Sequence, residues 1–135
     1  MVTSVNPYRI PATGWWGAQL GASAWMLGSA LMFFSKAPGV AAALLGCFVA
    51  MNLFGWVLWR SRERFSAYAA IQSFCAGAGL FTSIAIAVLD VSGHLGEWEP
   101  RFASQPHAVY FVLLLFPLVM LLLHFRFRGE ANRPV

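Results

Sequence analysis

The side chains that could bind a metal gather around the stretch 91–106. Imidazole and carboxylate groups at a suitable spacing bind zinc or copper in proteins. The stretch contains His94, Glu97 and Glu99, and Asp90 and His107 stand at its ends. Their spacing matches no strong metal-binding motif, and an exposed acidic loop is normally only solvated. We therefore predict an outer loop without a metal site.

The remaining polar residues do not form a recognisable catalytic group. A bis-histidine haem site needs two histidines at one depth on facing helices, whereas His107 and His124 lie about 25 Å apart along one helix. The sequence has no Ser/His/Asp arrangement, no glycine-rich phosphate loop after a strand, and no acidic residue inside an apolar run. The missing intramembrane acid also argues against proton-driven antiport. We predict a protein that is not an enzyme, with no catalytic residue and no cofactor.

One side of the apolar run 66–89 is polar, although the run is long enough to cross a bilayer. At about 100° per residue, the polar and small residues fall within roughly a third of the circumference. They are Tyr68, Gln72, Cys75, Gly79, Thr82, Ser83 and Asp90. A lipid-facing helix needs no such stripe, so we predict that this side faces other helices or water.

Three carboxamides are expected at one depth in the membrane. Counted inward from the cytoplasmic ends of their helices, Gln19, Asn52 and Gln72 all lie roughly 9–10 Å from the boundary. A second, weaker polar layer nearer the outside comprises Ser29, Thr82 and Ser83. The layers could form a constriction or solute site, or they could provide interhelical hydrogen bonds worth about 0.6 kcal/mol each. We favour the hydrogen bonds.

Four apolar runs must position these residues. The chain is 59% hydrophobic and 10% charged, whereas a soluble domain has about 25% charged residues. The runs are 13–34, 38–59, 66–89 and 107–125, each close to the ~20 residues that span a bilayer. We predict an all-α integral membrane protein with a four-helix transmembrane domain over residues 13–125. Residues 1–12 are expected to be irregular, and residues 126–135 to form a basic tail.

The basic residues predict the orientation of these helices. Of the nine Lys and Arg residues, all but Lys36 and Arg101 lie on the side that holds both termini and the loop after the second run. The positive-inside rule makes that side cytoplasmic. The first run is longer than the apolar core of a signal peptide, so we expect it to remain. We expect a bacterial inner membrane location and, because the charges stand at membrane edges, no nucleic-acid partner.

Small residues predict how the helices pack. In the first run Gly14, Gly17, Gly21, Ala24 and Gly28 share one narrow face, and Gly46 pairs with Ala50 in the second run. Such spacing lets another helix backbone approach closely. Gln19 and Ser23 lie on nearly the opposite face, so the first helix has two protein-facing sides. Either one side packs against a neighbouring protein, or both lie inside one four-helix bundle.

Aromatic residues and a proline complete the expected architecture. Trp15, Trp16, Trp56 and Trp59 are predicted as anchors at the cytoplasmic interface. The fourth run is almost purely aliphatic and aromatic, so we expect it to be the most lipid-exposed helix. Pro117 removes a backbone hydrogen bond there and is expected to kink it.

Two functions fit these features. The first is an accessory, assembly or interaction subunit that docks onto other helices through its glycine and polar faces. The alternative is a homo-oligomeric channel or transporter whose pathway is lined by the polar side of the run 66–89. Both readings place the chain in a lipid bilayer, as a homo-oligomer or within a larger membrane complex.

Overall fold

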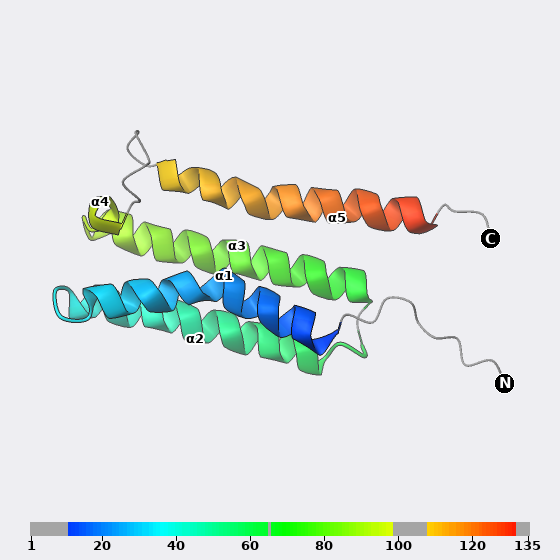
Figure 1. Cartoon of the computed structure of the whole chain (residues 1–135), viewed down its shortest axis with the longest axis horizontal. Helices are drawn as coiled ribbons and strands as arrows, with labels where there is room; N and C mark the ends of the chain where they lie inside the picture. Colours follow the sequence, from blue (N-terminus) through cyan, green and yellow to red (C-terminus); the bar gives the residue numbers. More distant parts are fainter. Residues whose placement is uncertain (1–10, 65, 99–107, 132–135) are drawn as a thin grey trace.

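The computed structural model describes residues 11–64, 66–98 and 108–131, and no strand occurs among them (Figure 1). The helices are α1 (Ala12–Phe33), α2 (Pro38–Arg60), α3 (Ala67–Val91), the short α4 (Leu95–Trp98), the 3-10 helix η1 (Ala108–Leu114) and α5 (Leu115–Ala131). The all-helical prediction is therefore confirmed for the part of the chain that is described. The four long helical segments begin and end close to the four apolar runs.

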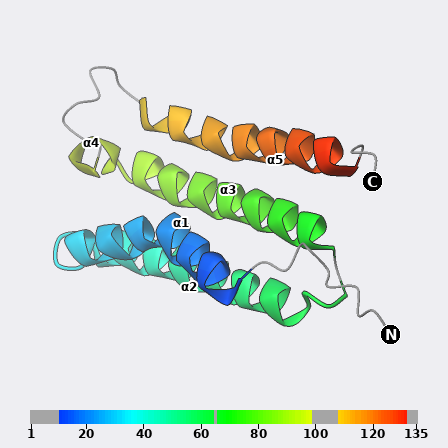
Figure 2. The same ribbon diagram turned by 45° about the vertical axis from the view of Figure 1, so that its right-hand side comes forward.

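The long helices lie side by side in a row that does not close into a compact bundle. α1 and α2 form an antiparallel hairpin, α3 packs along α2, and α5 packs along α3. Figures 1 and 2 show α5 on the side of α3 that faces away from α1 and α2. The start of α1, the α2–α3 turn and the end of α5 stand at one end. The α1–α2 turn and α4 stand at the other (Figure 1).

Local sequence signals set the helix boundaries. Pro38 occupies the first turn of α2, where its missing N–H costs no hydrogen bond. The Ser66 hydroxyl accepts a hydrogen bond from the Ala69 backbone N–H at 3.1 Å and so caps the start of α3. After α3 ends, Gly93 adopts a φ of 76°, a left-handed conformation that glycine accommodates without strain.

Three helices are long and apolar enough to cross a membrane. They are α2, α3 and the segment Ala108–Arg126, with mean hydropathies of 2.0, 1.9 and 2.5. Such helices imply contact with a lipid bilayer and an integral membrane protein. Among the described helices α1 does not belong to this group; its polar residues include Gln19, Ser23 and Ser29.

The fourth run is not an α-helix throughout, because it begins with a 3-10 segment. Only 6% of its most apolar window is buried, against 33% for α3, so it is the least covered of these three helices. A 3-10 segment from Ala108 to Leu114 precedes the α-helix. Pro117 then stands in the first turn of α5, where no intrahelical N–H bond is required. The predicted kink at Pro117 stays a prediction, and α5 continues to Ala131, into the expected tail.

The core lies where α1, α2 and α3 meet. Its largest fully buried side chains are Phe33, Met26, Leu44, Met51, Ile86 and Leu89. Gly77 of α3 provides room for a ring of α2, since a Cβ at Gly77 would stand 2.7 Å from Phe54 Cδ1. In a bilayer such close packing, and not exclusion of water, holds helices together.

Candidate functional site at the α1–α2 seam

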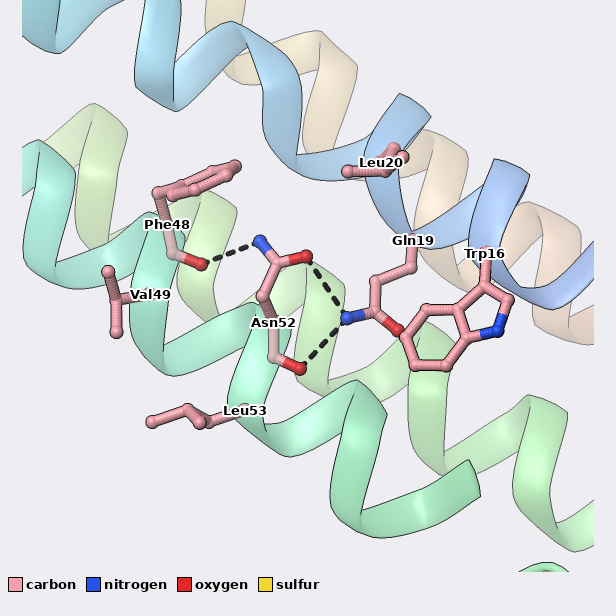
Figure 3. A pocket seen from close by; sticks show the side chains of 7 residues that line it. All are labelled: Trp16, Gln19, Leu20, Phe48, Val49, Asn52 and Leu53. Atoms are coloured by element: carbon pink, nitrogen blue, oxygen red, sulfur yellow. Dashed lines mark hydrogen bonds between the residues drawn. The ribbon is translucent and has the colours of Figure 1, made fainter. Parts of the chain in front are cut away.

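A cluster of three polar side chains, Gln19, Ser23 and Asn52, joins α1 to α2. Figure 3 shows Gln19 and Asn52 of this cluster. Gln19 Nε2 donates to the Asn52 backbone carbonyl at 2.8 Å and to Asn52 Oδ1 at 3.0 Å. Asn52 Nδ2 donates to Ser23 Oγ at 3.0 Å and to the Phe48 carbonyl at 2.8 Å. Ser23 in turn donates to the Gln19 carbonyl at 2.8 Å. The predicted meeting of Gln19 and Asn52 is present, with Ser23 as an additional member.

These bonds fix the orientation of the Gln19 amide. Its nitrogen faces two oxygens of Asn52, so the flipped amide would place oxygen against oxygen. Its oxygen has no hydrogen-bond partner among the described residues and occupies the space beside Gly55. A Cβ at Gly55 would stand 2.6 Å from Gln19 Cδ and 3.0 Å from Nε2. Gly55 therefore makes room for the carboxamide.

The same glycine binds a second residue of α1. The Trp15 indole Nε1 donates to the Gly55 carbonyl at 3.3 Å. Trp15 is buried and its ring packs 5.8 Å from Trp59 and 5.2 Å from Phe74, measured between ring centroids. Trp15 is thus a core residue, and its predicted role as an anchor at the cytoplasmic interface stays a prediction. Its neighbour Trp16 remains half-buried, close to Trp59.

An open groove of about 470 Å³ runs over the cluster on the outside of α1 and α2. Its walls are apolar, and Gln19 and Asn52 form its floor (Figure 3). The wall residues are Trp16, Leu20, Phe48, Val49 and Leu53. Because the carboxamide N–H groups are already bonded within the cluster, the groove offers mainly hydrocarbon surface. This shape suits an apolar chain better than a polar solute.

Residues on the polar side of α3 contact η1 and α5 along most of the length of α3. The Tyr68 hydroxyl bonds His124 Nδ1 at 2.7 Å, and Gln72 Nε2 donates to the Met120 carbonyl at 2.9 Å. At the opposite end the Tyr110 hydroxyl donates to Asp90 Oδ2 at 2.6 Å. Between them, a Cβ at Gly79 would stand 3.3 Å from Phe116, and Ser83 bonds the Gly79 carbonyl.

Gln72 is consequently not in contact with the other two carboxamides. It points to α5, whereas Gln19 and Asn52 meet at the α1–α2 seam. Thr82 also faces away from them, into a second apolar groove of about 450 Å³ between α1 and α5. Its buried hydroxyl has no hydrogen-bond partner within the described part of the chain. The structure thus divides the predicted polar layer between two helix pairs.

The glycine face of α1 points outward. Gly14, Gly17, Gly21 and Gly28 are exposed, and Cβ atoms at the last three would meet no described atom within 4 Å. Gly46 of α2 is equally open. The side of α1 that carries Gln19 packs within the chain, and the glycine side does not.

Sequence reasoning missed Gly55, the glycine that makes the close contact with Gln19. Leu44, Cys47, Met51 and Gly55 are all buried and recur at intervals of three and four along α2. This spacing is typical of a single buried helix face. This spacing predicts that Gly55 lies on the buried face of α2 and that Gly46 does not.

The described part of the outer loop forms a small polar cluster. Glu97 accepts from His94 Nδ1 at 3.0 Å and lies 3.5 Å from Lys36 Nζ, which comes from the α1–α2 turn. The hydrogen bond from His94, followed by the charge of Lys36, lowers the pKa of Glu97. The described residues contain no group of three metal-ligating side chains. Glu99 and His107, also considered for a metal site, lie outside the described residues.

Comparison of the chain with protein-family models, with curated proteins and with solved structures found no match.

Proposed function

We propose that all four long helices cross the membrane. α1 has 22 residues and is about 33 Å long, enough for a hydrocarbon core of about 30 Å. Its interrupting polar residues, Gln19, Ser23 and Ser29, are all buried against the rest of the chain. Its outward residues, such as Leu20 and Leu31, are apolar or small. The low hydropathy of α1 therefore does not prevent contact with lipid.

The end that carries Arg60, Arg62 and Arg64 is assigned to the cytoplasm. These arginines and Arg126 stand at the end of the molecule where α1 begins and α5 finishes (Figure 1). Lys36 is the described basic residue at the opposite end, so the positive-inside rule supports this orientation. In a bacterial inner membrane, a charged thiol reagent added outside should label Ser92→Cys and leave Ser61→Cys unlabelled. External labelling of Ser61→Cys contradicts the orientation.

We infer that the protein is a non-enzymatic interaction or assembly subunit, either of a homo-oligomer or of a larger membrane complex. The observation that carries this function is the open glycine face of α1. Gly17, Gly21, Ala24 and Gly28 form an uninterrupted small-residue surface that no described part of the chain covers. Such surfaces let two helix backbones approach closely, and van der Waals packing then holds them together.

The alternative of a solute pathway along α3 receives less support. A pathway would need the polar side of α3 to face water. Tyr68, Gln72 and Gly79 instead contact α5, and Asp90 accepts a hydrogen bond from Tyr110 of η1. These contacts favour a packed seam inside one subunit.

Replacing Gly21 by leucine tests the interaction function. Because a Cβ at Gly21 meets nothing within the chain, Gly21→Leu should leave thermal unfolding of the purified chain unchanged. The same substitution should reduce the mass of the particle extracted from native membranes to that of one chain in its lipid disc. Leu118→Ala on the exposed side of α5 is the control and should leave this mass unaltered. An unchanged mass for Gly21→Leu would refute the proposed interface.

A further inference from the structure

The face of α2 that lines the groove over the α1–α2 seam continues to the arginine-bearing end of the molecule. Val49 and Leu53 form its α2 wall, and Trp56 and Arg60 follow at helical intervals of three and four. At about 100° per residue these four residues share one face of α2. All four are exposed. An apolar track along α2 therefore ends at a positive charge.

The arginines at this end are held in place by tryptophans. The Arg60 guanidinium carbon lies 5.5 Å from the centroid of Trp56, and that of Arg62 lies 4.4 Å from the centroid of Trp59. Arg62 also donates to the Trp59 carbonyl at 3.0 Å. Neither guanidinium forms an ion pair with a described carboxylate, including Glu63 in the same turn. Both charges are therefore available to an anion.

The dimensions of this track match one lipid leaflet. From Val49 to Arg60 the helix rises about 17 Å, close to half of a hydrocarbon core about 30 Å thick. The groove volume is about 470 Å³. A partner helix about 10 Å in diameter would fill such a volume over only about 6 Å of its length. A hydrocarbon chain fits wholly within a groove of this size, whereas a partner helix would enter it only with side chains of one face.

We propose that this surface binds an anionic phospholipid of the leaflet on the arginine side. One acyl chain lies in the groove between Leu20 of α1 and Leu53 of α2. The phosphate lies at Arg60 and Arg62, whose planar guanidinium groups bind phosphate oxygens in pairs. Trp56 and Trp59 lie between the acyl chain and the phosphate, at the membrane interface, where aromatic rings are favoured. This site is separate from the glycine face of α1 and does not depend on it.

Native mass spectrometry of the purified chain in detergent tests this site, with phosphatidylglycerol and phosphatidylcholine of the same chain length as probes. We expect one phosphatidylglycerol to bind more tightly than phosphatidylcholine. Arg60→Gln should weaken phosphatidylglycerol binding about fivefold, the usual contribution of one basic residue at an anionic surface. Arg64→Gln is the matched control, because it removes the same charge from an exposed residue of the same turn. It should change the affinity less than twofold.

A second variant tests the chain-binding part of the groove. Val49→Trp places a large ring in the groove at an exposed position and should weaken the binding of both lipids while thermal unfolding stays unchanged. Equal loss of phosphatidylglycerol in Arg60→Gln and Arg64→Gln would overturn the proposal, because it would indicate a diffuse charge effect. Equal affinity for the two lipids in the wild type, or full binding by Val49→Trp, would also overturn it.

Discussion

Gly55→Ala should destabilise the α1–α2 seam although it adds only one methyl group. That methyl would stand 2.6 Å from Gln19 Cδ, so the carboxamide must move. Gln19 is 2% exposed and would lose its bonds to the Asn52 carbonyl and to Asn52 Oδ1. A buried polar group that loses its partners costs about 1–3 kcal/mol. Alanine recovers about 0.5–1 kcal/mol over glycine in a helix, which leaves a net loss of about 1 kcal/mol at the middle of these ranges.

Gly46→Ala is the matched control for this prediction. It makes the same substitution in the same helix, but a Cβ there meets no described atom within 4 Å. We expect it to be neutral or slightly stabilising. Reversible unfolding in mixed detergent micelles, followed by circular dichroism, measures both variants. Equal stability of Gly55→Ala and Gly46→Ala would refute the packing described here.

A double-mutant cycle identifies the cause of the loss. Gln19→Ala removes the side chain that the new methyl group would displace. Adding Gly55→Ala to Gln19→Ala should therefore cost nothing further, whereas it costs about 1 kcal/mol in the wild type. If the two losses are additive, the destabilisation arises from another contact of Gly55, such as that with Trp15.

Two further predictions concern water and pH. In a Cys47→Ala, Cys75→Ala background, cysteines at Gln72 and Ser83 should not react with a small charged thiol reagent, because Gln72 bonds to α5 and Ser83 bonds within α3. Reaction at both sites would support the solute pathway instead. The pKa of the Glu97 carboxyl group is lowered in the folded protein from an ordinary value of 4.5. The small stabilising effect of the ionised carboxylate should therefore be complete above pH 4.5 and disappear as the pH falls through the lowered pKa. Thermal unfolding of wild type and Glu97→Gln should differ at neutral pH and converge in acid, and a constant difference would contradict this linkage.

The sequence was sufficient to place the helices and to pair Gln19 with Asn52. Apolar runs of about 20 residues define helices well, and depth alone brought these two carboxamides to one level. Depth was insufficient for Gln72, because two residues at the same level can face different neighbours. Its partner is a backbone carbonyl of α5, Met120, and a backbone acceptor gives no signal in the amino-acid sequence.

The glycines show a second limit of sequence reasoning. Spacing identified Gly17 and Gly21 as a small-residue face, but spacing does not say whether the partner helix belongs to the same chain. Gly55 lacks a companion of this kind, yet it makes the closest contact with α1. Its role depends on the exact position of the Gln19 side chain, which only packing determines. The 3-10 segment before Pro117 was likewise not foreseen, because periodicity does not distinguish the two helix types over seven residues.

Labelling of unmodified native membranes with an apolar diazirine tests the proposed interface most directly. The reagent dissolves in the hydrocarbon core, and on illumination it inserts into residues that face lipid. Peptide mass spectrometry should find strong labelling of the outer side of α5, around Leu118 and Leu122. The face formed by Gly17, Gly21 and Gly28 should be protected in the membrane and become labelled once the chain is isolated in detergent. Equal labelling of α1 and α5 in the membrane would contradict the interaction function.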